Sequence, residues 1–320
     1  MDCFTTATRR SKTFAELHAL PILRPLPTVL LHIVSEYTVA PFLAGCRDGQ
    51  IWIRQDDGEQ QPWRVGFSNL VLPNGWPNRM AVANRHLLVL QPSADDSHFS
   101  EENIVALPLD TDTPNRTEWR DMHYHCEWRL LVLSCGTPIV LHFLRKDNRQ
   151  AFLYFRNVRH RVPLHLFHYS MHWTTTVIWN DCLILFGGYG AVASQVTMWN
   201  PTTTEWHRLP SLRQRGNLGL PFVTPLGLLL AGGLTAAHER SCLIQCLPSP
   251  QSASWTVLDW QLPAGANRYT QTWFVNGRLF VAPSDKSNRC WSLLIRPGIQ
   301  TSDWSPEPNT PHDFTTVFTL

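Results

Sequence analysis

The sequence predicts an all-β protein, a six-bladed β-propeller preceded by a short N-terminal helical segment. Groups of short apolar strands recur along the chain at a period of about 47 residues, and turns rich in glycine and proline separate the strands. The chain also holds 14 Trp and 24 Pro, which suit strands and loops better than helices. Four strands per repeat at this period are typical of a propeller, in which each repeat forms one radial blade.

The clearest repeat covers residues 173–212. It predicts four strands, at residues 174–179, 182–186, 194–200 and 205–210. Gly187 and Gly188 end the second strand, where the backbone must turn or pack closely. Trp199 comes before an Asn-Pro turn that cannot continue a strand ladder, because Pro201 has no N–H donor, and Trp206 follows the turn.

The next repeat has the same order of elements. Its strands are expected at residues 220–225, 227–231, 241–246 and 254–258, and Gly232 and Gly233 end the second of them. Gly188 and Gly233 are 45 residues apart, and a spacing of 49 residues separates Trp206 from Trp255 and Trp255 from Trp304. Trp119 and Trp63 extend this series of tryptophans toward the N-terminus.

Three more repeats keep the strand rhythm without the glycine pair. Their strands are expected at residues 80–83, 86–90 and 103–107, then 129–134, 138–143, 151–155 and 160–164, and finally 271–275, 278–282 and 290–295. First strands therefore start near residues 79, 128, 173, 219, 270 and 314, which predicts six blades.

The first repeat has no obvious first strand of its own. Its other strands are expected at residues 41–45, 50–53 and 63–65. The tail, residues 314–320, resembles residues 174–179 and is expected to supply the missing innermost strand, which would close the ring and cover a sheet edge. Residues 32–37 are a rival for that place, although Leu30, Ile33, Val34 and Tyr37 have the spacing of an amphipathic helix. The expected domains are an N-terminal tail with a short amphipathic helix over 1–39 and the six-bladed propeller over 40–320.

Residues 196–210 resemble the kelch repeat, which has a diglycine, an aromatic residue before an Asp/Asn-Pro turn, and then a Trp. Through its period the resemblance extends over residues 40–320. It implies a binding scaffold, and since no catalytic or metal-ligating pattern stands out among the residues, we expect a protein that is not an enzyme and holds no cofactor or metal. Some kelch proteins are enzymes, so an enzyme acting on a sugar or sugar acid at the channel mouth stays an alternative.

Residues 20–37 begin with Leu-Pro and continue into the apolar helical pattern, which resembles the opening helix of an F-box. This resemblance implies docking to a ubiquitin-ligase scaffold through residues 26–37, with the protein acting as a substrate receptor. The alternative is that the same helix only caps the propeller.

Basic residues are expected on one rim of the ring, where each chain segment enters an innermost strand, and aromatic residues accompany them. They are Arg79, Arg129, His172, Arg215, Arg268 and His312, with Trp76, Tyr189 and Tyr269 nearby. Low-dielectric walls would concentrate their field, so the expected ligand is an acidic or polar segment of a protein partner. The alternative is that these side chains brace neighbouring blades through backbone carbonyls.

The charge balance excludes a dedicated nucleic-acid binder, because 27 Lys and Arg against 25 Asp and Glu leave a net charge of +2. No apolar run has the length of about 18 residues that a membrane-spanning helix needs. The polar N-terminal residues do not resemble a signal peptide, so we expect a location in the cytoplasm, with the nucleus as an alternative. The 8 Cys are scattered without a CxxC pair, so no metal site is expected.

Overall fold

The computed structural model describes residues 42–47, 50–55, 64–65, 80–83, 86–90, 104–108, 126–144, 150–163, 174–187, 193–214, 219–235, 241–263, 271–275, 278–282, 290–295, 303–307 and 316–319. Within these residues the extended elements are antiparallel strands, and there is no helix. The strands form five four-stranded sheets and one three-stranded sheet in the described part of the chain. This arrangement is all-β and consistent with a β-propeller.

The first two sheets come from the N-terminal third of the chain and its C-terminal end. One has the order β23 (Thr316–Thr319), β1 (Phe42–Arg47), β2 (Gln50–Gln55) and β3 (Arg64–Val65). The three-stranded sheet has the order β4 (Met80–Ala83), β5 (His86–Leu90) and β6 (Ile104–Pro108).

The middle of the chain forms two four-stranded sheets in sequence order. One contains β7 (Cys126–Val132), β8 (Pro138–Leu144), β9 (Ala151–Phe155) and β10 (Val158–Arg161). The other contains β11 (Thr175–Trp179), β12 (Cys182–Phe186), β13 (Val196–Asn200) and β14 (Glu205–Leu209).

Two further sheets follow in the same way. They are β15 (Leu220–Thr224), β16 (Gly227–Ala231), β17 (Leu243–Leu247) and β18 (Thr256–Gln261), then β19 (Gln271–Val275), β20 (Arg278–Ala282), β21 (Cys290–Leu294) and β22 (Ser305–Glu307).

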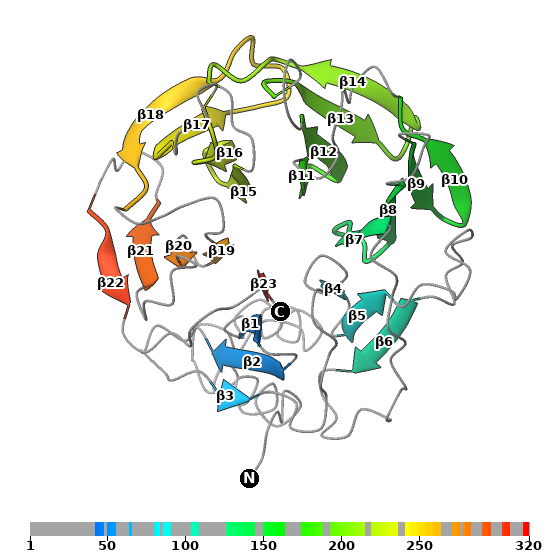
Figure 1. Ribbon diagram of the computed structural model, residues 1–320, viewed down its shortest axis with the longest axis horizontal. Coiled ribbons are helices and arrows are strands. Elements are labelled where there is room, and N and C mark those ends of the chain that lie inside the picture. The colour runs from blue at the N-terminus through cyan, green and yellow to red at the C-terminus, as the bar shows by residue number, and fades with distance from the viewer. Residues whose placement is uncertain are drawn as a thin grey trace, which may run out of the picture.

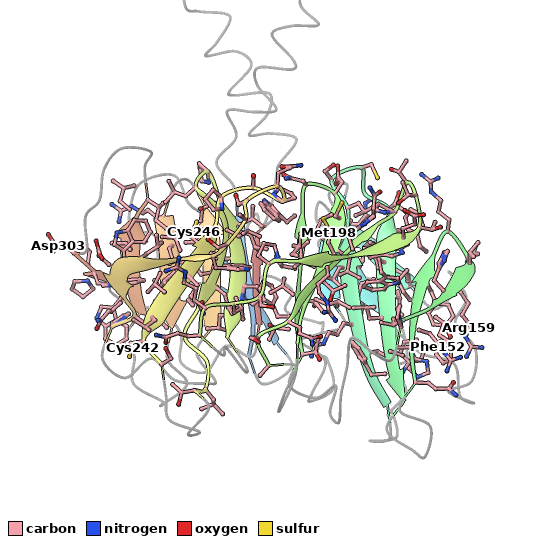
Figure 2. The ribbon with its side chains drawn as sticks, turned by 90° about the horizontal axis from the view of Figure 1, so that it is seen from above. Phe152, Arg159, Met198, Cys242, Cys246 and Asp303 are labelled. Atoms are coloured by element: carbon pink, nitrogen blue, oxygen red, sulfur yellow. The ribbon has the colours of Figure 1, made fainter. Side chains whose placement is uncertain are left out.

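The sheets stand around a common centre, with one edge strand of each sheet inside and the other outside (Figure 1). Successive inner strands contact each other in the order β4, β7, β11, β15, β19 and β23, and β23 also contacts β4. The contacts between β7 and β11 and between β23 and β4 are more limited than the others. In the side view, Cys242 and Cys246, beside and within β17, lie toward opposite faces of the ring (Figure 2). The strands therefore run from one face of the ring to the other.

The buried side chains lie between neighbouring sheets. Leu153 of β9 packs with Leu183 and Trp199 of the next sheet, and all three are fully buried. Ile184 of β12 and Leu228 of β16 belong to an equivalent cluster one sheet further on. Middle strands such as β9, β12 and β16 are therefore buried on both faces, which explains why they are apolar throughout rather than alternating.

Two of the two-residue turns that connect hairpins need positive φ at both of their residues. Arg156 and Asn157 have φ of 49° and 60° between β9 and β10, while Asn180 and Asp181 have 50° and 55° between β11 and β12. Such turns match the right-handed twist of the strands they join. Asn and Asp tolerate this conformation better than most residues, whereas Arg156 pays a conformational cost there.

The described strands agree closely with the strands expected from the sequence. The predictions for residues 80–83, 86–90, 151–155, 182–186, 227–231, 271–275 and 278–282 are confirmed to the residue. Residues 316–319 pair antiparallel with β1, with Thr316 opposite Cys46 and Thr319 opposite Leu43. The N-terminal segment 1–39, with its F-box-like stretch and the rival strand at 32–37, lies outside the described residues.

Candidate functional site

The predicted rim falls largely outside the part of the chain that the structure describes. The residues in question are Arg79, His172, Arg215, Arg268, His312, Trp76, Tyr189 and Tyr269. Their places on the rim therefore stay predictions. Arg129 is the one predicted rim residue that the structure describes.

Arg129 was expected where the chain enters the strand at 129–134, but it lies within β7, so the expected start of this strand was wrong, and its part in a binding rim stays a prediction. The strand begins three residues earlier, because Cys126 to Trp128 pair with β8 as the continuation of the same ladder. The Arg129 guanidinium lies 5.5 Å from the centre of the Phe143 ring on the neighbouring strand. A cation over an aromatic face is a favourable contact within the sheet.

A pair of hydrogen bonds holds the chain segment that precedes Arg215. Gln245 of β17 donates its side-chain N–H to the carbonyl of Gln214, and its Oε1 accepts the backbone N–H of Gln214, both at 3.0 Å. The Gln245 residue is only 3% exposed, whereas Gln214 is exposed, so the two bonds are partly shielded from water. The backbone next to a predicted rim position is thus fixed to the adjacent sheet.

The glycine pair after β16 makes a turn that other residues would strain. Gly232 and Gly233 have φ of 68° and 99°. A Cβ at Gly232 would lie 2.9 Å from a methyl carbon of Leu262 and 3.2 Å from the carbonyl of Ser241. The pair therefore supplies both a positive φ and close packing. Gly187 donates its N–H to the Gln195 carbonyl at the matching place after β12, while Gly188 lies outside the described residues.

Two of the periodic tryptophans bond to the sheet that precedes their own. Trp255 Nε1 donates to the carbonyl of Pro210 at 2.8 Å, directly after β14. Trp304 Nε1 donates to the carbonyl of Gln261 at 2.7 Å, at the end of β18. Each Trp stands one residue before the outer strand of its own sheet. The spacing of 49 residues therefore reflects a repeated contact between neighbouring sheets.

The other repeat markers also lie between sheets where they are described. Trp206 of β14 packs against the cluster that joins the β7–β10 and β11–β14 sheets. Trp199 of β13 lies in that cluster and meets the Phe155 ring edge-on, with centroids 5.3 Å apart. Trp63 and Trp119 lie outside the described residues. The described markers thus have structural contacts rather than an open binding face.

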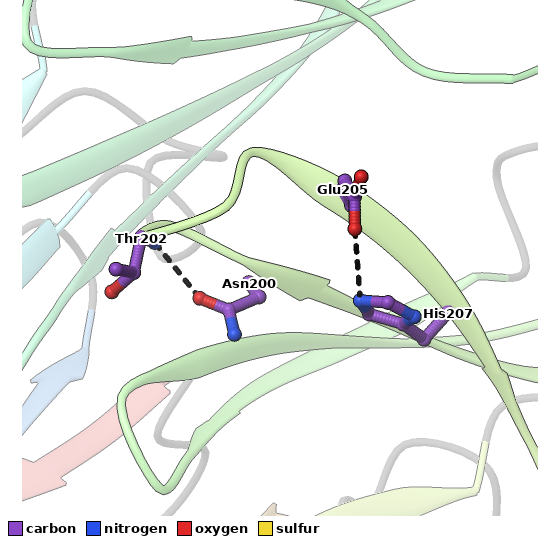
Figure 3. Close-up of polar contacts among 4 residues, drawn as sticks. All are labelled: Asn200, Thr202, Glu205 and His207. Carbon is purple, nitrogen blue, oxygen red and sulfur yellow. Dashed lines mark hydrogen bonds and ion pairs between the residues drawn. The ribbon is translucent and has the colours of Figure 1, made fainter.

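The side chain of Asn200 stabilises the Asn-Pro turn between β13 and β14 (Figure 3). Asn200 Oδ1 accepts the backbone N–H of Thr202 at 2.8 Å, and the Thr204 N–H donates to the Asn200 carbonyl at the same distance. Glu205 and His207 then face each other at 3.9 Å on the exposed side of β14. This is a local turn stabilised by an Asx contact, and it accounts for the sequence pattern without a ligand.

The structure buries one histidine, His142, that the sequence did not single out as a site residue. His142 of β8 stacks on Trp128 of β7 with ring centroids 3.6 Å apart and planes 5° from parallel. His142 is only 2% exposed, and neither ring nitrogen has a hydrogen-bond partner within the described structure. Burial, and secondarily the charge of Arg159, lowers the pKa of His142 to about 4. The imidazole is therefore neutral at pH 7 and acts as part of the apolar interface.

A second contact joins two hairpin turns of neighbouring sheets. The Asp181 carboxylate accepts hydrogen bonds from the N–H and the Oγ of Ser134, at 2.8 Å and 2.6 Å. These bonds lower the pKa of the Asp181 carboxyl, because they favour its charged form. The exposed Cys135 follows Ser134, and its contact with Thr137 lowers the pKa of the thiol.

Among the described residues, no group of three or more His, Cys, Asp or Glu side chains is placed to hold a metal ion. A membrane-spanning helix needs about 20 apolar residues, and no helix of that kind exists in the described part of the chain. No protein-family model and no curated protein matches this chain.

Proposed function

We propose that this protein is a six-bladed, kelch-like propeller closed by its C-terminal strand, and that it is a non-enzymatic module that binds an acidic or polar segment of a partner protein. The proposed closure is supported by the pairing of β23 with β1 and by the succession of contacts among the inner strands. A ring joined in this way ties its first and last repeats together and covers the edge of β1 with β23, which favours a rigid support for loops on its two faces.

Closure is testable with one engineered cysteine. Thr316 is the register partner of Cys46, so a Thr316→Cys variant should form a disulfide with Cys46 under mild oxidation, visible as a shift in non-reducing electrophoresis. Val317→Cys is the matched control, because its register partner is Gly45. A Thr316→Cys variant that forms no bond dependent on Cys46 would contradict the closure.

The proposed binding surface is the rim that carries Arg79, Arg215 and Arg268. The observation that carries this proposal is the buried Gln245 contact with Gln214, which fixes the backbone immediately before Arg215. We expect an anchored neighbour at Gln214 to reduce the conformational freedom that binding of a carboxylate costs, which would strengthen such an ion pair.

The test is titration of a glutamate-rich peptide by calorimetry. A triple variant with Arg79, Arg215 and Arg268 changed to Ala should bind at least about tenfold more weakly, since each lost contact to a charged partner contributes on the order of 1 kcal/mol. Arg208→Ala, which removes an exposed arginine from the outer strand β14, should leave the affinity unchanged. Equal affinity of the triple variant and the wild type would reject the rim as the binding surface.

A further inference from the structure

The outer strand β10 carries a basic surface that is separate from the rim. Arg159 and Arg161 lie on β10, Arg156 lies in the turn before it, and all three side chains are exposed. No ion pair joins these three to a carboxylate within the described residues. The outer strands of the next two sheets differ, because β14 carries Glu205, 3.9 Å from His207, as well as Arg208, and β18 carries Asp259 and no Lys or Arg.

Two of these arginines rest on aromatic rings of the neighbouring strand. The Arg159 guanidinium lies 3.5 Å from the centre of the Phe152 ring, and the Arg156 guanidinium lies 5.1 Å from that of Phe155. Figure 2 shows Arg159 and Phe152 at the outer periphery of the ring. Stacking orients the planar guanidinium while leaving its N–H donors open to a carboxylate.

Within the described residues β10 is an edge strand that pairs only with β9. Val162 donates its N–H to Ala151, and the register of β10 on β9 has no irregularity. Because hydrogen bonding alternates along an antiparallel ladder, the N–H and C=O groups of Arg159 and Arg161 point away from β9. Pro163 has no N–H, so the open edge ends there.

The charge on this edge also decides what can pair with it. A second β10 edge would bring arginines opposite arginines, which disfavours pairing between two copies of this chain. An extended segment with glutamates at alternate positions would instead place its carboxylates on the face of Arg159 and Arg161. Val158, which is 54% exposed, adds an apolar contact at the start of the strand.

We propose that β10 is a docking edge for an extended acidic segment of another protein, which adds to the sheet as a fifth strand and pairs its carboxylates with Arg159 and Arg161. This surface goes beyond the rim of the proposed function, since it lies on the outer wall of the ring (Figure 1). Backbone bonds supply part of the affinity and the arginines supply the preference for acidic partners.

The test measures fluorescence anisotropy of a labelled peptide of alternating Glu and Thr. We expect saturable binding that weakens as salt is raised, and about tenfold weaker binding by an Arg159→Gln/Arg161→Gln double variant. The matched control, Arg208→Gln on β14, should bind like the wild type. Urea unfolding midpoints within error of the wild type establish that both variants are folded. Undiminished binding by the double variant would overturn the proposal.

Two further arms identify what is bound and where. A peptide of the same charge with Pro in place of each Thr cannot form the backbone ladder and should bind at least about tenfold more weakly. Equal binding of the two peptides would show that charge alone accounts for the contact, and it would overturn the addition of a strand. Stronger binding of a single-stranded oligonucleotide than of the peptide would assign the surface to nucleic acid. The Arg79, Arg215 and Arg268 triple variant should retain this binding. If the triple variant loses binding and the Arg159/Arg161 double variant does not, the peptide binds to the rim.

Discussion

Replacing Trp255 by Phe tests whether the periodic tryptophans hold neighbouring sheets together. The indole is fully buried, meets the Phe186 ring edge-on at 5.9 Å, and donates a 2.8 Å hydrogen bond to Pro210 of the preceding sheet. Phe keeps the ring contact but cannot donate. The Pro210 carbonyl then loses its partner, which costs about 1–3 kcal/mol, and the space left by the smaller ring adds to this.

We therefore expect Trp255→Phe to lower the free energy of unfolding by about 2–4 kcal/mol, a large part of the 5–15 kcal/mol typical of folded proteins. Urea unfolding followed by far-ultraviolet circular dichroism measures the loss without relying on tryptophan emission. Trp304→Phe is the matched control, because its bond to Gln261 lies at an exposed site and its loss should cost about 1 kcal/mol or less. A Trp255→Phe variant less perturbed than Trp304→Phe would refute the reasoning.

Other variants test the interfaces and turns. Between pH 7 and pH 4 the free energy of unfolding of the wild type should fall by up to about 3 kcal/mol, because the unfolded chain protonates His142 below about pH 6.5 and the folded chain does so only near pH 4. A His142→Phe variant should depend less on pH. The control, His207→Gln at an exposed histidine, should keep the pH dependence of the wild type. Gly227→Ala should cost more than about 3 kcal/mol, because φ is 126° and the new Cβ would lie 2.4 Å from the Leu247 carbonyl; a thermal midpoint near that of the wild type would contradict this. Arg156→Asn should stabilise by about 0.5–1 kcal/mol, since Asn accepts the positive φ of this turn, and an unchanged or lower urea midpoint would count against it.

Most strand positions could be predicted because glycine and proline leave visible marks. Gly232 and Gly233 end β16 where positive φ is needed, and Pro201 ends β13 because it has no N–H. The spacing of Trp255 and Trp304 predicted a repeat but not the hydrogen bonds to the preceding sheet. A period reports how often an element recurs, and it contains no information about the atom that the element contacts.

The candidate site was harder to predict, for reasons visible at particular residues. Arg129 follows a polar stretch that looks like a loop, yet the ladder to β8 already begins at Cys126. His142 sits in an apolar run whose two faces are both buried, so alternation did not mark it as different from Val140. The basic edge at β10 was missed because its charges matter only once the strand is known to be outermost.

The hydrogen bonds of Trp255 and Trp304 have a direction along the chain. In both, the donor belongs to a later repeat and the acceptor to the repeat made before it. During synthesis, which proceeds from the N-terminus, an earlier repeat can complete this contact only after the following one has left the ribosome. A growing chain therefore keeps an incomplete interface at its newest end until the following repeat has folded against it.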